Sequence, residues 1–256
     1  MKPYYQDEWT TIYLGDCREI LPQLEVFDLG VTSPPYNSKK QWWECGSNGM
    51  FKDMAHKFTR GGGWYPDEIP EDEYQAREKK LVAMALSKCS GSICYNHKVR
   101  YAFKRAGRSF HPIEWLPAEK LWCEIIWDRM SGVTFNSRRP VVSDERIFVL
   151  GRPKIYHNIG LNTVWRIVPD REAPEHPCAF PLAIPKRLIA MFTNPGDMVL
   201  DYYAGSGTTL VAAKQLNRKS IGIEIEEKYC ELAVKRLSQS VMDLRMCDIS
   251  GSSNQG

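Results

Sequence analysis

The sequence predicts an α/β fold with a doubly wound, mostly parallel sheet. Short apolar runs bounded by turn residues alternate with longer stretches in which apolar residues recur at helical spacing. This alternation is typical of parallel strands joined by crossover helices that cover both faces of the sheet. We expect strands at 11–14, 26–32, 92–96, 124–128, 146–150, 198–201 and 220–225, and helices at 73–89, 182–192, 208–216 and 227–238.

Length and composition favour one domain in the cytoplasm. A chain of 256 residues with 43% hydrophobic content can bury one substantial core. We expect a single domain over 1–249 and a disordered tail over 250–256, with insertions at about 37–70 and 130–165. The eight cysteines form no C-x-x-C pair and no apolar run is long enough for a membrane span, which indicates reduced thiols in a cytosolic protein. The net charge of +3 permits a local nucleic-acid patch without requiring one.

The segment Asp201–Thr209 (DYYAGSGTT) predicts a nucleoside site at a strand-to-helix turn. Gly205 and Gly207 let the backbone turn sharply after an apolar strand and approach a ligand closely. Glu224 ends the next strand, where its carboxylate can accept both ribose hydroxyls. No lysine follows Gly207, which excludes a Walker A loop, and the third glycine of the dinucleotide fingerprint is missing. A nucleoside without a pyrophosphate fits best, and this points to S-adenosylmethionine.

The segment Thr32–Tyr36 (TSPPY) predicts a site for a flat base that carries an amino group. Two consecutive prolines stiffen a turn at the end of a strand. Rigid carbonyls and the Ser33 hydroxyl can accept hydrogen bonds from an amine, while the Tyr36 ring offers a stacking face. Accepting the amine protons while holding the nitrogen in line with a methyl sulfonium raises its reactivity. Because stacking needs only the ring, Tyr36→Phe is expected to keep much of the activity.

Together these segments resemble the amino-DNA methyltransferases, which methylate N4 of cytosine or N6 of adenine. The resemblance runs from about 11 to 237, and the TSPPY string precedes the glycine turn, as in the circularly permuted beta group. Residues 15–17 (GDC) are similar to the loop that reads the cofactor adenine, and 176–181 (HPCAFP) to the segment over the methionine end. The resemblance implies a seven-stranded sheet with one antiparallel strand, a flipped base, S-adenosylmethionine as methyl donor, S-adenosylhomocysteine as product and no metal.

The resemblance also assigns roles to individual residues. The catalytic residues it implies are Ser33, Pro34, Pro35 and Tyr36. The cofactor residues it implies are Asp16, Cys17, Thr32, Phe180, Asp201, Tyr202, Ala204, Gly205, Ser206, Gly207, Thr208 and Glu224. Serine before the two prolines favours cytosine-N4 as the target, because Asp or Asn is commoner there in adenine-N6 enzymes; adenine stays open as the alternative.

Two other functions compete with this one. Pro177-Cys178 resembles the nucleophile of cytosine-C5 methyltransferases, but no Glu-Asn-Val string supplies the partner acid, so Cys178→Ala is expected to stay active. A catalytically inactive DNA-binding module is the second alternative, and the intact catalytic and glycine strings argue against it.

The expected macromolecular partner is double-stranded DNA, with a companion restriction endonuclease as a second candidate, and we expect a monomer or homodimer. Arginine reads guanine through two parallel hydrogen bonds, and tryptophans can wedge into or line DNA. The residues expected to contact DNA lie in the two insertions or at their borders: Trp42, Trp43, Arg129, Arg138 and Arg139.

Overall fold

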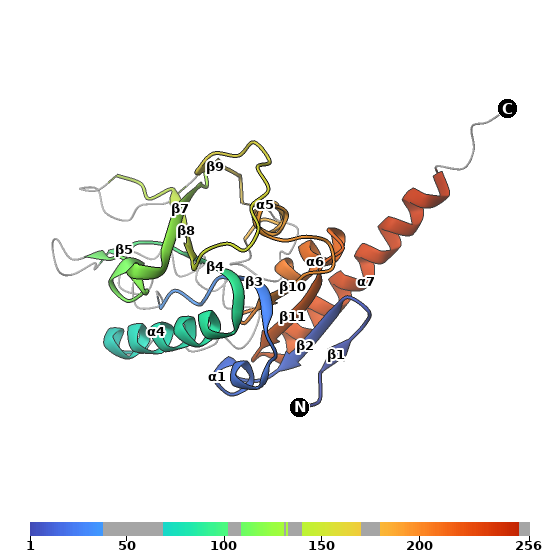
Figure 1. Ribbon diagram of the computed structural model, residues 1–256, viewed down its shortest axis with the longest axis horizontal. Coiled ribbons are helices and arrows are strands. Elements are labelled where there is room, and N and C mark those ends of the chain that lie inside the picture. The colour runs from blue at the N-terminus through green and yellow to red at the C-terminus, as the bar shows by residue number, and fades with distance from the viewer. Residues whose placement is uncertain (38–68, 102–108, 131, 133–139, 170–179, 251–256) are drawn as a thin grey trace, which may run out of the picture.

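The computed structural model describes residues 1–37, 69–101, 109–130, 132, 140–169 and 180–250. Its centre is one large sheet (Figure 1), in which the described strands follow the order β1-β2-β11-β10-β3-β4-β8-β7-β9. These strands are β1 (Tyr5–Gln6), β2 (Thr10–Leu14), β3 (Phe27–Thr32), β4 (Cys89–His97), β7 (Leu121–Asp128), β8 (Asp144–Leu150), β9 (Val164–Arg166), β10 (Met198–Asp201) and β11 (Lys219–Glu224). A separate small sheet pairs β5 (Arg100–Tyr101) with β6 (Ser109–Phe110).

The large sheet is mostly parallel, as predicted. β2, β11, β10, β3 and β4 run in one direction, whereas β8 is antiparallel to both of its neighbours, β4 and β7. β1 and β9 are edge strands of two and three residues. When these two edge strands are set aside, the described sheet has the expected seven strands, and β8 is its antiparallel member.

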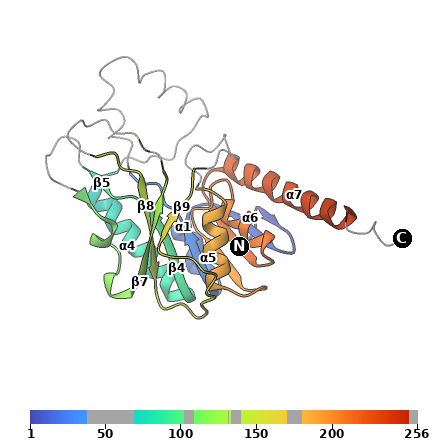
Figure 2. The same ribbon diagram turned by 90° about the horizontal axis from the view of Figure 1, so that it is seen from above.

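Helices cover both faces of the sheet. α1 (Cys17–Ile20) and α4 (Glu71–Lys88) pack on one face, and α5 (Ala183–Phe192), α6 (Thr208–Gln215) and α7 (Glu227–Ser250) lie on the other (Figure 2). The helix that follows β3 among the described elements, α4, packs on one face, and the helix that follows β10, α6, packs on the opposite face. The direction of winding therefore changes between the neighbouring strands β3 and β10. Open α/β sheets bind ligands at such a switch point. Three short 3₁₀ helices complete the described elements: η1 (Leu21–Gln23), η2 (Pro112–Glu114) and η3 (Ala118–Lys120).

The local sequence explains where these helices begin and which face they bury. α4 starts with three acidic residues, 71–73, whose charges complement the partial positive charge of a helix N-terminus. α6 starts after Gly207, whose φ of 77° lies in the left-handed region that side chains disfavour. α5 buries Ile184, Leu188 and Phe192, which recur every four residues on the face that packs toward β3 and β4.

Several boundaries differ from the prediction. α7 continues to Ser250 instead of ending at 238, so residue 250 belongs to this helix and not to a tail; residues 251–256 lie outside the described residues, as do 38–68 of the first insertion. The segment 130–165 is not wholly an insertion, because β8 lies within it and joins the sheet between β4 and β7. β1 and β9 were missed because they are too short to show alternation. Among the described residues, no helix combines the length and apolarity that crossing a bilayer requires.

Candidate active site

The two motifs found in the sequence meet at adjacent strand ends. β3 leads into the Ser33–Tyr36 string and β10 leads into the glycine turn, and these two parallel strands are direct neighbours. The Thr32 hydroxyl at the end of β3 donates to Oδ1 of Asp201 at the end of β10, over 3.0 Å. The fold therefore joins two strings whose linked residues are 169 positions apart.

Asp201 is a buried carboxylate whose oxygens are occupied by protein donors. Its side chain is 2% exposed. Besides the bond from Thr32, Oδ1 accepts from the Tyr203 amide (3.1 Å) and Oδ2 accepts from the Thr209 hydroxyl (2.6 Å). Burial raises the pKa of Asp201 to about 6, although these hydrogen bonds act in the opposite direction. Asp201 thus joins β3, β10 and the start of α6.

The turn between β10 and α6 depends on its glycines and on α7. Gly205 and Gly207 have φ angles of 50° and 77°. A Cβ on Gly207 would lie 2.7 Å from the Cβ of Ala233 on α7, which is closer than real Cβ atoms approach. Arg236 of α7 donates from Nη1 to the carbonyl and the hydroxyl of Ser206, over 2.8 and 3.0 Å. α7 therefore holds the turn in its shape.

Glu224 stands at the carboxyl end of β11, where a ribose acceptor is expected. Its Oε2 accepts from the Gly205 amide over 2.7 Å, and its Oε1 accepts from the amides of Ile225 (3.0 Å) and Glu226 (2.9 Å). Burial raises the pKa of this carboxyl. A carboxylate offers about four acceptor positions, so one position on Oε2 remains beside these backbone donors. The geometry fits one ribose hydroxyl, whereas two would displace a backbone donor.

Of the other predicted cofactor residues, two are only partly buried and five are buried. Asp16 caps α1 by accepting from the Arg18 amide over 2.8 Å, and the bonds from Arg18 lower the pKa of Asp16. Phe180 packs, half-buried, against the hydrophobic cluster around α5. Five more are buried within the protein: Cys17, Tyr202, Ala204, Ser206 and Thr208.

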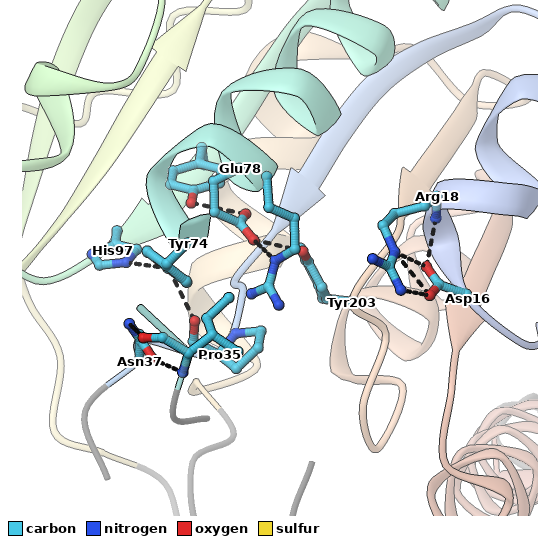
Figure 3. Close-up of polar contacts among 11 residues, drawn as sticks. Asp16, Arg18, Pro35, Asn37, Tyr74, Glu78, His97 and Tyr203 are labelled. Carbon is cyan, nitrogen blue, oxygen red and sulfur yellow. Dashed lines mark hydrogen bonds and ion pairs between the residues drawn. The ribbon is translucent and has the colours of Figure 1, made fainter. Parts of the chain in front are cut away.

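A buried carboxylate beside the glycine turn was not predicted. Glu78 of α4 is fully buried, and burial raises its pKa. It accepts three hydrogen bonds, from Tyr203 Oη (2.8 Å), Tyr95 Oη (3.1 Å) and Arg77 Nε (3.2 Å). In the view of Figure 3, Tyr203 lies between Glu78 on one side and Asp16 on the other. Glu78 therefore ties α4 to the first residues of the glycine turn.

The Ser33–Tyr36 string is tied to residues of β4 and β8. The Tyr36 hydroxyl donates to Glu145 Oε2 over 2.8 Å and lies 2.9 Å from Ser33 Oγ. Asn96 Nδ2 lies 2.7 Å from the Tyr36 oxygen, 2.9 Å from Glu145 Oε2 and 3.3 Å from Ser33 Oγ. Asn96 and Glu145 are both buried. The Tyr36 hydroxyl is thus part of a network, whereas the sequence indicated a use only for its ring.

Neighbouring side chains also hold the Tyr36 ring and the Pro35 carbonyl. The Tyr36 ring centre lies 4.6 Å from the ring centre of His97, and Lys98 Nζ lies 5.3 Å from it. The Tyr74 hydroxyl lies 3.0 Å from the Pro35 carbonyl and 2.8 Å from His97 Nε2 (Figure 3). His97 Nδ1 faces the Lys98 carbonyl and so carries the hydrogen, and burial holds the His97 pKa well below its usual range. Tyr74 therefore shares its hydroxyl hydrogen between Nε2 and the Pro35 carbonyl.

Of the residues expected to contact DNA, Arg129 lies in the described part of the chain. Its Nη1 lies 3.1 Å from Glu145 Oε1, and its guanidinium lies 5.7 Å from the Trp127 ring centre. Arg129 thus borders the catalytic string, and its contact with DNA stays a prediction. The following residues lie outside the described part: Trp42, Trp43, Arg138, Arg139 and Cys178.

Sequence reasoning missed several residues that hold this site together. Asn96 could have been found from the sequence, because it is the last residue of the strand predicted at 92–96 and site residues gather at strand ends. Glu145 lies at the start of β8, and only the antiparallel direction of β8 brings that start to the edge where its parallel neighbours end. Glu78 and Arg236 are helix residues whose partners are distant in sequence, so no local pattern marked them.

Known proteins resemble this chain along most of its length. The DNA methylase family N6_N4_Mtase matches residues 27–235. The chain is 38% identical to the orphan methyltransferase M.BamHII of Bacillus amyloliquefaciens, over 90% of this chain and 92% of that relative. It is 26% identical to the Type II methyltransferase M.SmaI of Serratia marcescens, over 88% of this chain and 90% of that relative. The chain belongs to the amino-DNA methyltransferases.

Solved structures of methyltransferases share the fold. The PvuII DNA methyltransferase, described as cytosine-N4-specific, aligns with a TM-score of 0.73 at 21% identity, over 92% of this chain and 88% of that one. A putative DNA modification methylase from Thermus thermophilus, complexed with S-adenosyl-L-methionine, aligns with a TM-score of 0.59 at 22% identity, over 90% of this chain and 93% of that one. This amino-DNA methyltransferase is an S-adenosylmethionine-dependent enzyme of the cytosine-N4 or adenine-N6 type.

Proposed function

We propose that this methyltransferase transfers a methyl group to the exocyclic N4 amine of a cytosine flipped out of double-stranded DNA. The observation that carries the proposal is the place of the Ser33 hydroxyl. It follows β3 directly, 2.9 Å from the Tyr36 hydroxyl, and β3 is the neighbour of the strand that leads into the glycine turn. A hydroxyl acceptor there suits the amine of a base, and the cytosine-N4 specificity in the name of the PvuII neighbour supports the choice of cytosine.

The proposal assigns the cofactor to the residues around the glycine turn. Glu224 accepts one ribose hydroxyl through the open position on Oε2, and Asp16 accepts from the adenine amine. Phe180 packs on the methionine end, while Gly205 and Gly207 let the backbone approach closely. Bound in this way, S-adenosylmethionine supplies an electrophilic methyl group.

The residues of the catalytic string bind and orient the target amine. Ser33 and the Pro34 carbonyl accept its two hydrogens, and the Tyr36 ring offers a surface for the base. Flipping a base out of the duplex costs a few kcal/mol of stacking and pairing, and these contacts offset part of that cost. Holding the nitrogen in line with the methyl carbon supplies the orientation that the reaction needs. No thiol nucleophile takes part, so Cys178→Ala should remain active.

The test is to identify the methylated base. The full chain is incubated with mixed-sequence duplex DNA and S-adenosylmethionine, and the digested DNA is analysed by nucleoside mass spectrometry. N4-methylcytosine is the expected product, and Ser33→Ala should lower its yield. N6-methyladenine would overturn the assignment of the base within the same enzyme class. 5-Methylcytosine would overturn the proposed chemistry.

A further inference from the structure

Glu145 ends the hydrogen-bond network of the catalytic string, although the proposed function gives it no task. It lies on β8, its side chain is buried, and its two oxygens face different partners. Oε2 accepts from the Tyr36 hydroxyl (2.8 Å) and from Asn96 Nδ2 (2.9 Å), and Oε1 accepts from Arg129 Nη1 (3.1 Å). Arg129 stabilises the negative charge of this carboxylate, which therefore accepts hydrogen bonds and donates none.

The charge on Glu145 fixes the direction of the neighbouring hydrogen bonds. The single hydrogen of the Tyr36 hydroxyl must point to the carboxylate. At 2.9 Å, Ser33 must therefore donate its own hydrogen to the Tyr36 oxygen, because Tyr36 has none left to give. The Asn96 amide keeps its NH₂ group toward the same acceptors, since a flipped amide would set its oxygen against the carboxylate. Ser33 Oγ then keeps a lone pair and cannot donate to a ligand.

We propose that Glu145 is a positioning residue for methyl transfer and the final acceptor of the proton that the target amine loses. This inference rests on the proposed function, because it requires an amine at Ser33. The chain of hydrogen bonds runs from the amine to Ser33, from Ser33 to Tyr36, and from Tyr36 to Glu145. It makes Ser33 an acceptor, which suits an amino group and rejects a base that presents a carbonyl oxygen at this point.

The proton balance of the transfer follows this chain. The amine nitrogen forms a bond to the methyl carbon while the sulfur–carbon bond breaks, and the sulfur keeps that electron pair. The nitrogen then carries the positive charge and gives one proton to Ser33 Oγ. Ser33 passes its own hydrogen to the Tyr36 oxygen, and Tyr36 passes its hydrogen to Glu145 Oε2. The two hydroxyls end as they began, and the carboxylate ends neutral.

The decisive variant is Glu145→Gln. The amide oxygen of glutamine can still accept from Tyr36, but it cannot take up the proton. We expect the single-turnover rate at saturating DNA and cofactor to fall about hundredfold, the lower end of typical effects of general acid–base groups. The affinity for S-adenosylmethionine, measured by calorimetry, should stay within about twofold, because β3 and β4 lie between β8, which carries Glu145, and β10, which leads into the glycine turn. Thermal unfolding checks that the variant folds.

A double-mutant cycle tests whether Tyr36 and Glu145 act in one proton-transfer chain or have two independent structural roles. Tyr36→Phe removes the middle hydroxyl and should lower the single-turnover rate about as much as Glu145→Gln, whereas a role for the ring alone would leave much of the activity. If the residues act in series, the double variant should be no slower than the slower single variant. Glu124→Gln is the matched control: on the neighbouring β7, Glu124 Oε1 pairs with Arg146 over 2.8 Å instead of with Tyr36 or Asn96. It should keep the wild-type rate.

Two results would overturn the inference. One is a Glu145→Gln enzyme whose single-turnover rate stays within about twofold of wild type. The other is a double variant whose loss is the product of the two single losses, because independent roles multiply. Failure of the proposed function is recognised separately, since the wild-type enzyme would then leave no methylated exocyclic amine in the DNA.

Discussion

The cofactor end and the base end of the site are built from different kinds of contact. At the cofactor end, Asp201 binds Thr209 eight positions away and Glu224 binds Gly205 nineteen positions away. At the base end, Tyr36 is held by Asn96 and Glu145, which are 60 and 109 positions away. The glycine turn with Glu224 is thus a continuous strand–turn–helix–strand unit, which Asp16 and Phe180 join from elsewhere in the chain, while the base end is assembled by the sheet from separate strands. The glycine turn and Glu224 can therefore be recognised from local sequence, whereas Asn96 and Glu145 reach Tyr36 only through the fold.

Mutations at the two ends should also impair different steps, namely cofactor binding and methyl transfer. Variants of the glycine turn and Glu224 should weaken cofactor binding, and variants around Pro35 should slow methyl transfer at saturating cofactor. Asp201 is the exception, because its carboxylate bonds to Thr32 on one side and to Thr209 on the other.

The largest effect is expected for Gly207→Ala. The added Cβ meets Ala233 at 2.7 Å, and a φ of 77° disfavours any side chain, so the turn must change shape. We expect at least a hundredfold loss of S-adenosylmethionine affinity, about 3 kcal/mol, measured by calorimetry. Gly196→Ala is the control, because Gly196 has a φ of 90° but open space around its Cβ position. Equal losses in both variants would show that the contact with α7 does not matter.

Glu224→Ala comes next. It removes the ribose acceptor, and we expect a ten- to hundredfold loss of cofactor affinity, about 1.4–3 kcal/mol, because a charge-assisted hydrogen bond is lost. The transfer rate at saturating cofactor should change little. Glu226→Ala is the matched control, since the side chain of Glu226 has no assigned role. Unchanged affinity in Glu224→Ala would remove this residue from the cofactor site.

Asp201 should make stability depend on pH. Its pKa of about 6 in the folded protein lies above the ordinary value of 3.8, so the folded state binds the proton more tightly than the unfolded state does. As the pH falls from about 7 to 4, this group should add about 2 kcal/mol to the free energy of unfolding. Asp201→Asn lacks the proton-binding group. Denaturant unfolding of both proteins across this range should show the free energy of unfolding of the wild type rising relative to that of Asp201→Asn as the pH falls. A constant difference between the two free energies would contradict the assignment.

The smallest effect is expected for Tyr74→Phe at the base end. It removes the hydroxyl that contacts the Pro35 carbonyl, a buried hydrogen bond worth about 1 kcal/mol. The single-turnover rate should fall about fivefold with unchanged cofactor affinity. Tyr5→Phe removes a comparable hydroxyl contact, to Asp7 at 3.0 Å on the edge strand β1, and should leave the rate as it is. A loss of cofactor affinity in Tyr74→Phe would show that the two ends are coupled.

The parts of this fold that the sequence predicted are those encoded by neighbouring residues. Apolar runs gave the seven long strands, and the spacing of Gly205, Gly207 and Glu224 gave the turn and the strand that follows it. Glu145 could not be found in this way, because its place at the site depends on the antiparallel direction of β8. Glu78 resembles an ordinary charged residue of a helix surface, and only the packing of α4 on the sheet buries it.

The bond between Thr32 and Asp201 has a consequence for biosynthesis. The two strands it joins are neighbours in the sheet, but the ribosome adds Asp201 of β10 169 residues after Thr32 of β3. β10 and β11 must leave the exit tunnel before the centre of the sheet can close, and pairings of such large sequence separation form slowly. A nascent chain that stops before β10 therefore holds the complete TSPPY string and no active site, so methylation cannot begin before β10 and β11 have been translated.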